Sequence, residues 1–171
     1  MTGVQTCALP ISTSASQVAV TTGTNIKTML QVKASSTIGF LVVEWGISFD
    51  GSAAATPIEV ELIEGDSSSG STVTAHVAAG IVKLDGIALA GGDPTTNLFP
   101  VGTTSTGYTS TGEGTNTTAR LFDVQFIAPT NQYVKQFPLG LEPISQVSCL
   151  TKIRVTAGAA VNCYCYVVVR V

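Results

Sequence analysis

Apolar residues recur at every second position through most of this 171-residue chain, a spacing that places them on one face of a β-strand. The clearest example is the segment 40–49, in which every odd position is apolar: Leu41, Val43, Trp45, Ile47 and Phe49. Glu44, Gly46 and Ser48 lie between them. We therefore expect these odd positions to be buried in a core, with the following residues packed around them: Ile58, Val60, Leu62, Ile153 and Val155.

The same alternation predicts further strands, at residues 58–63, 17–22, 27–33, 120–127, 150–156 and 161–171. We expect the last two to pair as a closing hairpin around Ala157-Gly158-Ala159. Residues 73–84 have enough alanine for a turn or two of helix, but their valine and threonine content favours a strand equally.

Stretches rich in glycine, serine and threonine separate the predicted strands, at residues 65–70, 91–94 and 102–118. About seven to nine short strands with such turns predict an all-β fold, an antiparallel β-sandwich of jelly-roll or Greek-key type with little helix. The segment 129–143 contains three prolines, which a central strand does not tolerate. We expect it to cross an edge or an end of the sandwich.

The N-terminus is unlike the rest of the chain. Residues 2–11, Thr-Gly-Val-Gln-Thr-Cys-Ala-Leu-Pro-Ile, read codon for codon as the translation of a common short-read sequencing adapter. Such a segment is left out of fold reasoning, as an expression scar is. We expect residues 1–12 to be a sequence artefact or a loose N-terminal extension, and residues 13–171 to form a single β-sandwich domain.

Composition narrows the classes of function. Charged residues make up only 11% of the chain, against about 25% in an average soluble domain, so we expect part of the surface to be buried against other subunits. The net charge of −3 and the scattered basic residues argue against a nucleic-acid partner. Outside residues 2–11, no apolar run approaches the roughly 20 residues of a membrane-spanning helix.

No residue pattern predicts catalysis. The single histidine, His76, has no nucleophile motif near it in sequence, and we interpret it as structural. The motif Gly65-Asp-Ser-Ser-Ser-Gly70 lacks the Gly-x-Ser-x-Gly spacing of a nucleophile elbow and is interpreted as a loop. Gly112-Glu-Gly114 is not a phosphate-binding loop, because no helix is predicted after it. We therefore expect no catalytic residues, no cofactor and no small-molecule substrate.

A metal site is not predicted either. Asp50, Asp85, Asp93 and Asp123 are spread along the chain, and they would bind calcium only if the fold brought several together. Leaving aside Cys7, the cysteines Cys149, Cys163 and Cys165 are expected to be buried thiols without a disulfide or a zinc ion. Asn116-Thr117-Thr118 fits the glycosylation pattern, which is a weak signal in so threonine-rich a chain.

Three segments carry a resemblance: Val43-Glu-Trp-Gly-Ile-Ser-Phe-Asp-Gly51, Pro129-Thr-Asn-Gln-Tyr-Val-Lys-Gln-Phe-Pro-Leu-Gly140 and Ile153-Arg-Val-Thr-Ala157. Together they resemble phage and metagenome proteins of the virion structural class, in particular small jelly-roll capsid decoration (cement) proteins. The resemblance implies a non-enzymatic protein of the capsid surface, a homotrimer that binds the major capsid protein of a tailed phage.

Other functions remain open on sequence grounds. A tail or head-fibre component is the alternative within the virion class. A secreted filament subunit would need a donated strand or an open groove, and a carbohydrate-binding module would need exposed aromatic residues. The only tryptophan, Trp45, lies on the face predicted to be buried, which weakens the carbohydrate hypothesis.

Overall fold

The computed structural model of the chain describes residues 8–12, 20–51, 56–67, 69–77, 99–116 and 119–171, and these residues form strands and connecting loops without a helix. The strands are β1 (Ala8–Ser12), β2 (Val20–Thr21), β3 (Lys27–Lys33), β4 (Phe40–Asp50), β5 (Ile58–Gly65), β6 (Thr72–Ala75), β7 (Gly107–Gly112), β8 (Ala119–Ile127), β9 (Gln132–Gln136), β10 (Ile144–Ser145), β11 (Leu150–Thr156) and β12 (Asn162–Arg170). The predicted all-β fold is confirmed.

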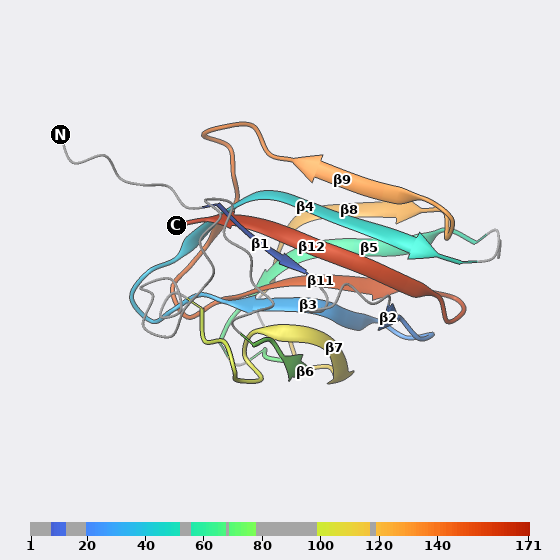
Figure 1. The fold of residues 1–171 in the computed structure, drawn as a ribbon, viewed down its shortest axis with the longest axis horizontal. Coiled ribbons are helices and arrows are strands. Elements are labelled where there is room, and N and C mark those ends of the chain that lie inside the picture. The colour runs from blue at the N-terminus through green and yellow to red at the C-terminus, as the bar shows by residue number, and fades with distance from the viewer. Residues whose placement is uncertain (1–7, 13–19, 52–55, 68, 78–98, 117–118) are drawn as a thin grey trace.

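The strands form two antiparallel sheets that pack face to face (Figure 1). In sheet A, β12 and β4 are the central strands, with β1 and β2 along the free side of β12 and with β9 and β10 along the free side of β4. In sheet B the order is β6-β7-β3-β11-β5-β8. The predicted β-sandwich is confirmed.

The strand order within this sandwich is that of a jelly roll. Sheet A contains β2-β12-β4-β9 and sheet B contains β3-β11-β5-β8, so the chain passes repeatedly from one sheet to the other. Among the described residues, the β6–β7 pair adds two further strands beside β3. Two sheets that share the chain in this way close over one core, as in other double-sheet β-proteins.

The core lies between the sheets, and both contribute to it. Trp45, Ile47 and Phe49 from sheet A are buried, as predicted. The predicted neighbours from sheet B are buried as well: Ile58, Val60, Leu62, Ile153 and Val155. Cys163, Cys165, Val167 and Val169 complete the inner face of β12.

The prediction was wrong for Leu41 and Val43, which are only partly buried, whereas Phe40 and Val42 are buried in their place. The reason is a β-bulge. Opposite β12, Val168 pairs with Glu44 and Val169 with Val42, so Val43 is an extra residue in the ladder. One extra residue reverses which positions face the core on either side of it.

The predicted hairpin between the last two strands was also wrong. β11 pairs with β3 and β5 in sheet B, and β12 pairs with β4 and β1 in sheet A. The residues between them, including Gly158, therefore cross from one sheet to the other. Alternation indicates which residues of a strand face a core, but it does not indicate which strand lies beside it.

The predictions for three further segments have different outcomes. The glycine-rich run 102–118 was wrongly interpreted as turns throughout, because β7 lies within it and pairs with β3 and β6. The segment 129–143 does follow an edge of the sandwich, as β9 beside β4. Residues 73–75 belong to strand β6, and the rest of the helix-or-strand segment 73–84 lies mostly outside the described residues.

The N-terminal boundary stays a prediction. Residues 8–12 form β1 and pair with Tyr166–Arg170 of β12, while residues 1–7 lie outside the described part. Ladder hydrogen bonds join backbone groups only, so a free strand edge accepts an extended segment of almost any sequence. The pairing of β1 is therefore compatible with either origin of these residues.

The buried tryptophan gives a direct test of the core. Trp45→Ala should lower the free energy of unfolding by about 3–5 kcal/mol, because it leaves a large cavity between the sheets. Chemical denaturation followed by tyrosine fluorescence measures this change. The control is Val134→Ala on the neighbouring strand β9, where the side chain is exposed and the change should stay within about 0.5 kcal/mol. A tryptophan variant as stable as the control would contradict the assignment of this core.

Candidate functional site

The outer face of sheet B carries a polar cluster that the strand pattern places there. Gln31 of β3 lies opposite Lys152 of β11, and Thr28 lies opposite Arg154. Their neighbours Leu30 and Ile153 face the core, so these four polar side chains face away from it. We call the residues that cover this face, 69–71 and 113–116, the polar cover.

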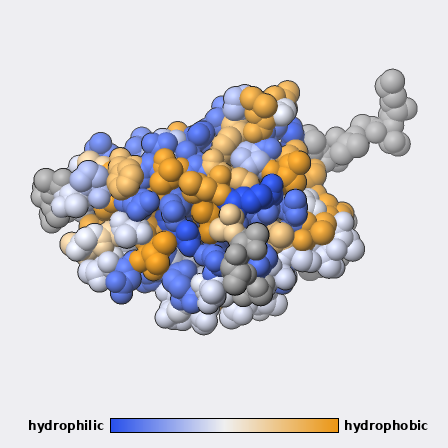
Figure 2. Space-filling model, turned by 180° about the vertical axis from the view of Figure 1, so that it is seen from behind, coloured by the Kyte–Doolittle hydropathy of each residue, from blue (hydrophilic) through white to orange (hydrophobic). Residues whose placement is uncertain are grey.

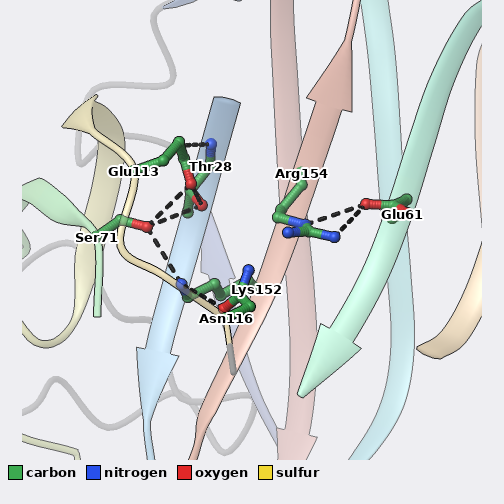
Figure 3. A network of polar contacts seen from close by, with 7 residues as sticks. All are labelled: Thr28, Glu61, Ser71, Glu113, Asn116, Lys152 and Arg154. Carbon is green, nitrogen blue, oxygen red and sulfur yellow. Dashed lines mark hydrogen bonds and ion pairs between the residues drawn. The ribbon is translucent and has the colours of Figure 1, made fainter. Parts of the chain in front are cut away.

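Lys152 is completely buried beneath the polar cover. Its ammonium nitrogen Nζ donates to Ser71 Oγ at 3.2 Å and to Asn116 Oδ1 at 3.3 Å (Figure 3). It also donates to the backbone oxygen of Ser69. Burial lowers the pKa of Lys152, and the charge of Glu113 opposes part of this shift. Among the ion pairs of the described residues, none includes Lys152, so its direct partners are neutral oxygens.

Glu113 completes this cluster from the other side. Its carboxylate accepts hydrogen bonds from the backbone N–H and the hydroxyl of Thr28, the latter at 2.8 Å, and from Ser71 Oγ at 3.2 Å. The hydroxyl of Ser71 therefore lies between the amine of Lys152 and the carboxylate of Glu113 (Figure 3). Ser71 is itself held by its backbone N–H, which donates to Gln31 Oε1 at 2.9 Å.

An ion pair lies beside the cluster on the same face. Arg154 donates two hydrogen bonds to Glu61 Oε2, at 3.0 and 2.7 Å. Both side chains are partly buried and come from the adjacent strands β11 and β5. In Figure 3 the Arg154–Glu61 pair lies beside the Lys152 cluster, and the dashed lines connect residues only within the pair and within the cluster.

A second polar cluster joins the two sheets at the edge formed by β8 and β9. Asp123 of β8 is buried, and its carboxylate accepts hydrogen bonds from Trp45 Nε1 at 3.2 Å and from the Tyr133 hydroxyl at 2.9 Å. Gln125 and Lys135 donate to the other carboxylate oxygen. Burial, together with the hydrogen bond to Asp123 and the charge of that carboxylate, raises the pKa of Tyr133 to about 12.

The end of the sandwich beyond β9 carries exposed apolar side chains. Leu139, Leu141 and Ile144 are 83%, 73% and 56% exposed, and Val147 follows in the same segment. We call residues 138–141 the apolar turn. The loop that follows β9 lies at the upper left of the ribbon in Figure 1, and orange atoms mark the same region at the top of Figure 2, just right of the centre, where the molecule is seen from behind.

The apolar turn is held firmly by polar contacts. The N–H of Leu141 donates to the oxygen of Pro138 at 2.9 Å, and Gly140 has φ 86°, which together define a type II turn. Glu142 accepts a hydrogen bond from the N–H of Gly140 and pairs with Arg170 of β12 at 2.8 Å. Its own backbone N–H, that of Gly140 and the charge of Arg170 lower the pKa of Glu142.

His76 packs against strand β7. It is completely buried after β6, and its ring lies against that of Tyr108 with centroids 5.0 Å apart. Its backbone N–H donates to the oxygen of Thr106, and its oxygen accepts from Gly102. These contacts fit the structural interpretation of His76.

Among the other motifs singled out in the sequence, the loops 65–70 and 112–114 meet at the polar cover, where Gly114 lies against Gly70. In the loop 65–70, Gly65 ends β5 and the N–H of Ser69 donates to Asp66 in a turn. Gly112 ends β7, and Glu113 binds Thr28. Among the aspartates, Asp50 ends β4 and Asp123 lies in the β8–β9 cluster, whereas Asp85 and Asp93 lie outside the described residues.

The cysteines differ in burial, and one residue of the glycosylation motif is described. Cys163 and Cys165 are buried thiols on the inner face of β12, as predicted, and burial raises the pKa of both. Cys149 is a free thiol and only partly buried. Of the motif 116–118 only Asn116 is described, and its side-chain oxygen accepts from Lys152.

Sequence reasoning missed the Lys152 cluster and the Asp123 cluster. One signal was present for the first, because Lys152 stands within the strand Leu150–Thr156, where a charged residue needs buried partners. Those partners come from residues 69–71 and 113–116, which are distant in sequence and lie in glycine-rich loops. For Asp123, alternation in β8 places the side chain inward, but it does not reveal the donors on β4 and β9.

Comparisons with known proteins give no family and no relative for this chain. No protein-family model, no curated protein and no solved structure matches the chain. Within the part of the chain that the structure describes, no helix has the length and apolar character of a membrane span. The same residues contain no group of three or more His, Cys, Asp or Glu side chains placed to hold a metal ion.

Removing the Asp123 carboxylate should destabilise the edge between β8 and β9. Asp123→Ala leaves the buried N–H of Trp45 without its acceptor, which should cost about 1–3 kcal/mol in the free energy of unfolding. Lys135→Ala removes a half-exposed partner of the same carboxylate and should cost under about 1 kcal/mol. Denaturant titration of the two variants tests this order, and equal losses would contradict the role assigned to the Trp45–Asp123 bond.

Proposed function

We propose that this chain is a non-enzymatic virion structural protein, a capsid decoration (cement) protein on the surface of a tailed-phage head. In this proposal it forms a homotrimer, binds the major capsid protein and stabilises the particle by bridging its capsomers. It uses no cofactor and no small-molecule substrate, and it binds neither nucleic acid nor a membrane. The jelly-roll order of the strands supports this class, because viral capsid domains often have that architecture.

The apolar turn is the observation that carries the proposal. Leu139 and Leu141 project from a turn that Glu142 and Arg170 hold in place, so little conformational entropy is lost when a partner covers them. Both leucines are more than two-thirds exposed, so a partner that covers them removes most of their apolar surface from water. A protein that docks many copies on a lattice gains apolar burial of roughly 25 cal/mol per Å² at each copy.

The low charge content supports the same conclusion. With 11% charged residues and a net charge of −3, the surface offers few groups that oppose association with another neutral surface. The acidic balance disfavours contact with packaged nucleic acid, so the outer side of the head suits this chain better than its interior.

The alternatives differ in how well the geometry suits them. A tail or head-fibre component remains the second candidate, because the same apolar turn would serve any assembled virion part. A carbohydrate-binding module is disfavoured, since Trp45 is fully buried and bonded to Asp123 rather than presented to a sugar. A secreted filament subunit would need an open groove for a donated strand, whereas β11 and β12 of this chain each have a partner strand on both sides.

The oligomeric state of the purified protein tests the assembly step. Light scattering coupled to size exclusion should report a trimer, and Leu139→Asp combined with Leu141→Asp should weaken association by about a hundredfold or more. Ile26→Asp is the matched control, because Ile26 is also exposed but lies at the opposite end of the sandwich, before β3. A wild-type protein that stays monomeric at all concentrations would contradict the trimer.

The location is tested on particles. Peptides of this chain should appear in gradient-purified tailed-phage particles from the source sample, and electron microscopy of the heads should place the protein on the outside of the capsid. A chain that never copurifies with particles would overturn the proposal. Its presence only in tails or fibres would favour the second candidate.

A further inference from the structure

The Lys152 cluster brings together the three groups that a covalent cross-link between side chains requires. These are a buried primary amine, a carboxamide in contact with it and a carboxylate within reach of the proton that must move. They come from β11 and from the loop after β7, segments that are separated in the chain and meet only in the folded protein. We propose that Lys152 and Asn116 form an intramolecular isopeptide bond, with Glu113 and Ser71 carrying the proton.

Position favours the reaction. Lys152 Nζ lies 3.3 Å from Asn116 Oδ1, so the amine is already beside the carbonyl group that it attacks. Groups held at such a distance react with effective molarities far above those of free reactants. The amine has little freedom to move away, because it also contacts the Ser69 oxygen and Ser71 Oγ.

The environment favours the reactive form of the amine. A lysine attacks a carbonyl carbon only when it is neutral, and an ammonium group without a counter-charge is costly to bury. Lys152 is completely buried, its direct partners are neutral oxygens, and its pKa is lowered by burial. These conditions are unusual for a lysine that only stabilises a strand, because such residues normally pair directly with a carboxylate.

The proton has a defined path. Ser71 Oγ lies 3.2 Å from Lys152 Nζ and 3.2 Å from Glu113 Oε2. The ammonium of Lys152 passes one proton to the Ser71 hydroxyl, which passes its own proton to the Glu113 carboxylate. Thr28 keeps this carboxylate in place through its backbone N–H and its hydroxyl.

The bond changes then balance without a further reactant. The lone pair of Lys152 Nζ forms a bond to Asn116 Cγ, and the C=O electron pair moves to Oδ1. When the C=O bond re-forms, the bond from Cγ to Nδ2 breaks, and Nδ2 takes up a proton from Glu113 and leaves as ammonia. The nitrogen of Lys152 loses its remaining extra proton to the ammonia, so the products are an amide bond and an ammonium ion.

The leaving group has an exit. Asn116 is only partly buried, so ammonia formed at its side chain reaches water without passing through the core. Glu113 is exposed and lines an open hollow of about 590 Å³ between the loop before β3 and the end of β7. The bond would fasten the polar cover to β11, a benefit to any protein that must stay folded outside a cell, and it does not depend on the capsid role.

The mass of the folded protein decides the proposal. After purification and denaturation, the full chain should weigh less than its sequence requires by the mass of one ammonia molecule. Trypsin does not cleave after an acylated lysine, so digestion should yield a branched peptide that joins residues 84–120 to residues 136–154. Tandem mass spectrometry should place the branch at Asn116 and Lys152.

Three variants and one control identify the side chains that take part in the reaction. Lys152→Arg, Asn116→Ala and Glu113→Gln should each have the full mass of their sequences, because each removes the nucleophile, the electrophile or the base. Glu61→Gln is the control, since it removes a carboxylate of the same face that pairs with Arg154, and it should keep the reduced mass. A folded wild-type chain with its full mass, or a reduced mass that persists in Asn116→Ala, would overturn the proposal.

Discussion

The buried side chain of Trp45 connects the two sheets of the sandwich, both by packing in the core and by its hydrogen bond to the Asp123 carboxylate. Trp45 lies on β4 in sheet A and Asp123 on β8 in sheet B, so this bond joins the sheets through the core. A buried carboxylate is stable only when donors surround it, and here Tyr133 and Lys135 supply two more from β9. Asp123 therefore connects β8, the edge strand of sheet B, with β9, the edge strand of sheet A.

This closed edge also determines where the apolar turn lies. β9 leads directly into residues 138–141, and its pairing with β4 fixes the position from which the chain leaves the sheet. Glu142 and Arg170 then bind the turn to β12, so both central strands of sheet A hold it. The proposed docking surface is therefore part of the rigid sandwich, which is how a protein presents apolar side chains to a partner at low entropic cost.

The sequence was sufficient to predict the fold class and most strands, because alternation is a local signal. The predicted segments 27–33 and 150–156 coincide with β3 and β11. Three features of the fold could not be predicted from the sequence. The bulge at Val43 depends on the partner strand, the separation of β11 from β12 depends on global topology, and β7 has a glycine- and threonine-rich sequence typical of turns. The Lys152 cluster was missed for the same reason, since its partners lie in loops that meet it only after folding.

The central claim is that this jelly roll works as an assembled structural protein whose apolar turn is covered by another chain. The most direct measurement is a cryo-electron microscopy map of the assembled protein at side-chain resolution. The account predicts that Leu139 and Leu141 lie beneath a neighbouring chain, while Trp45 stays bonded to Asp123 inside each subunit. A map in which both leucines face solvent in every subunit would contradict it.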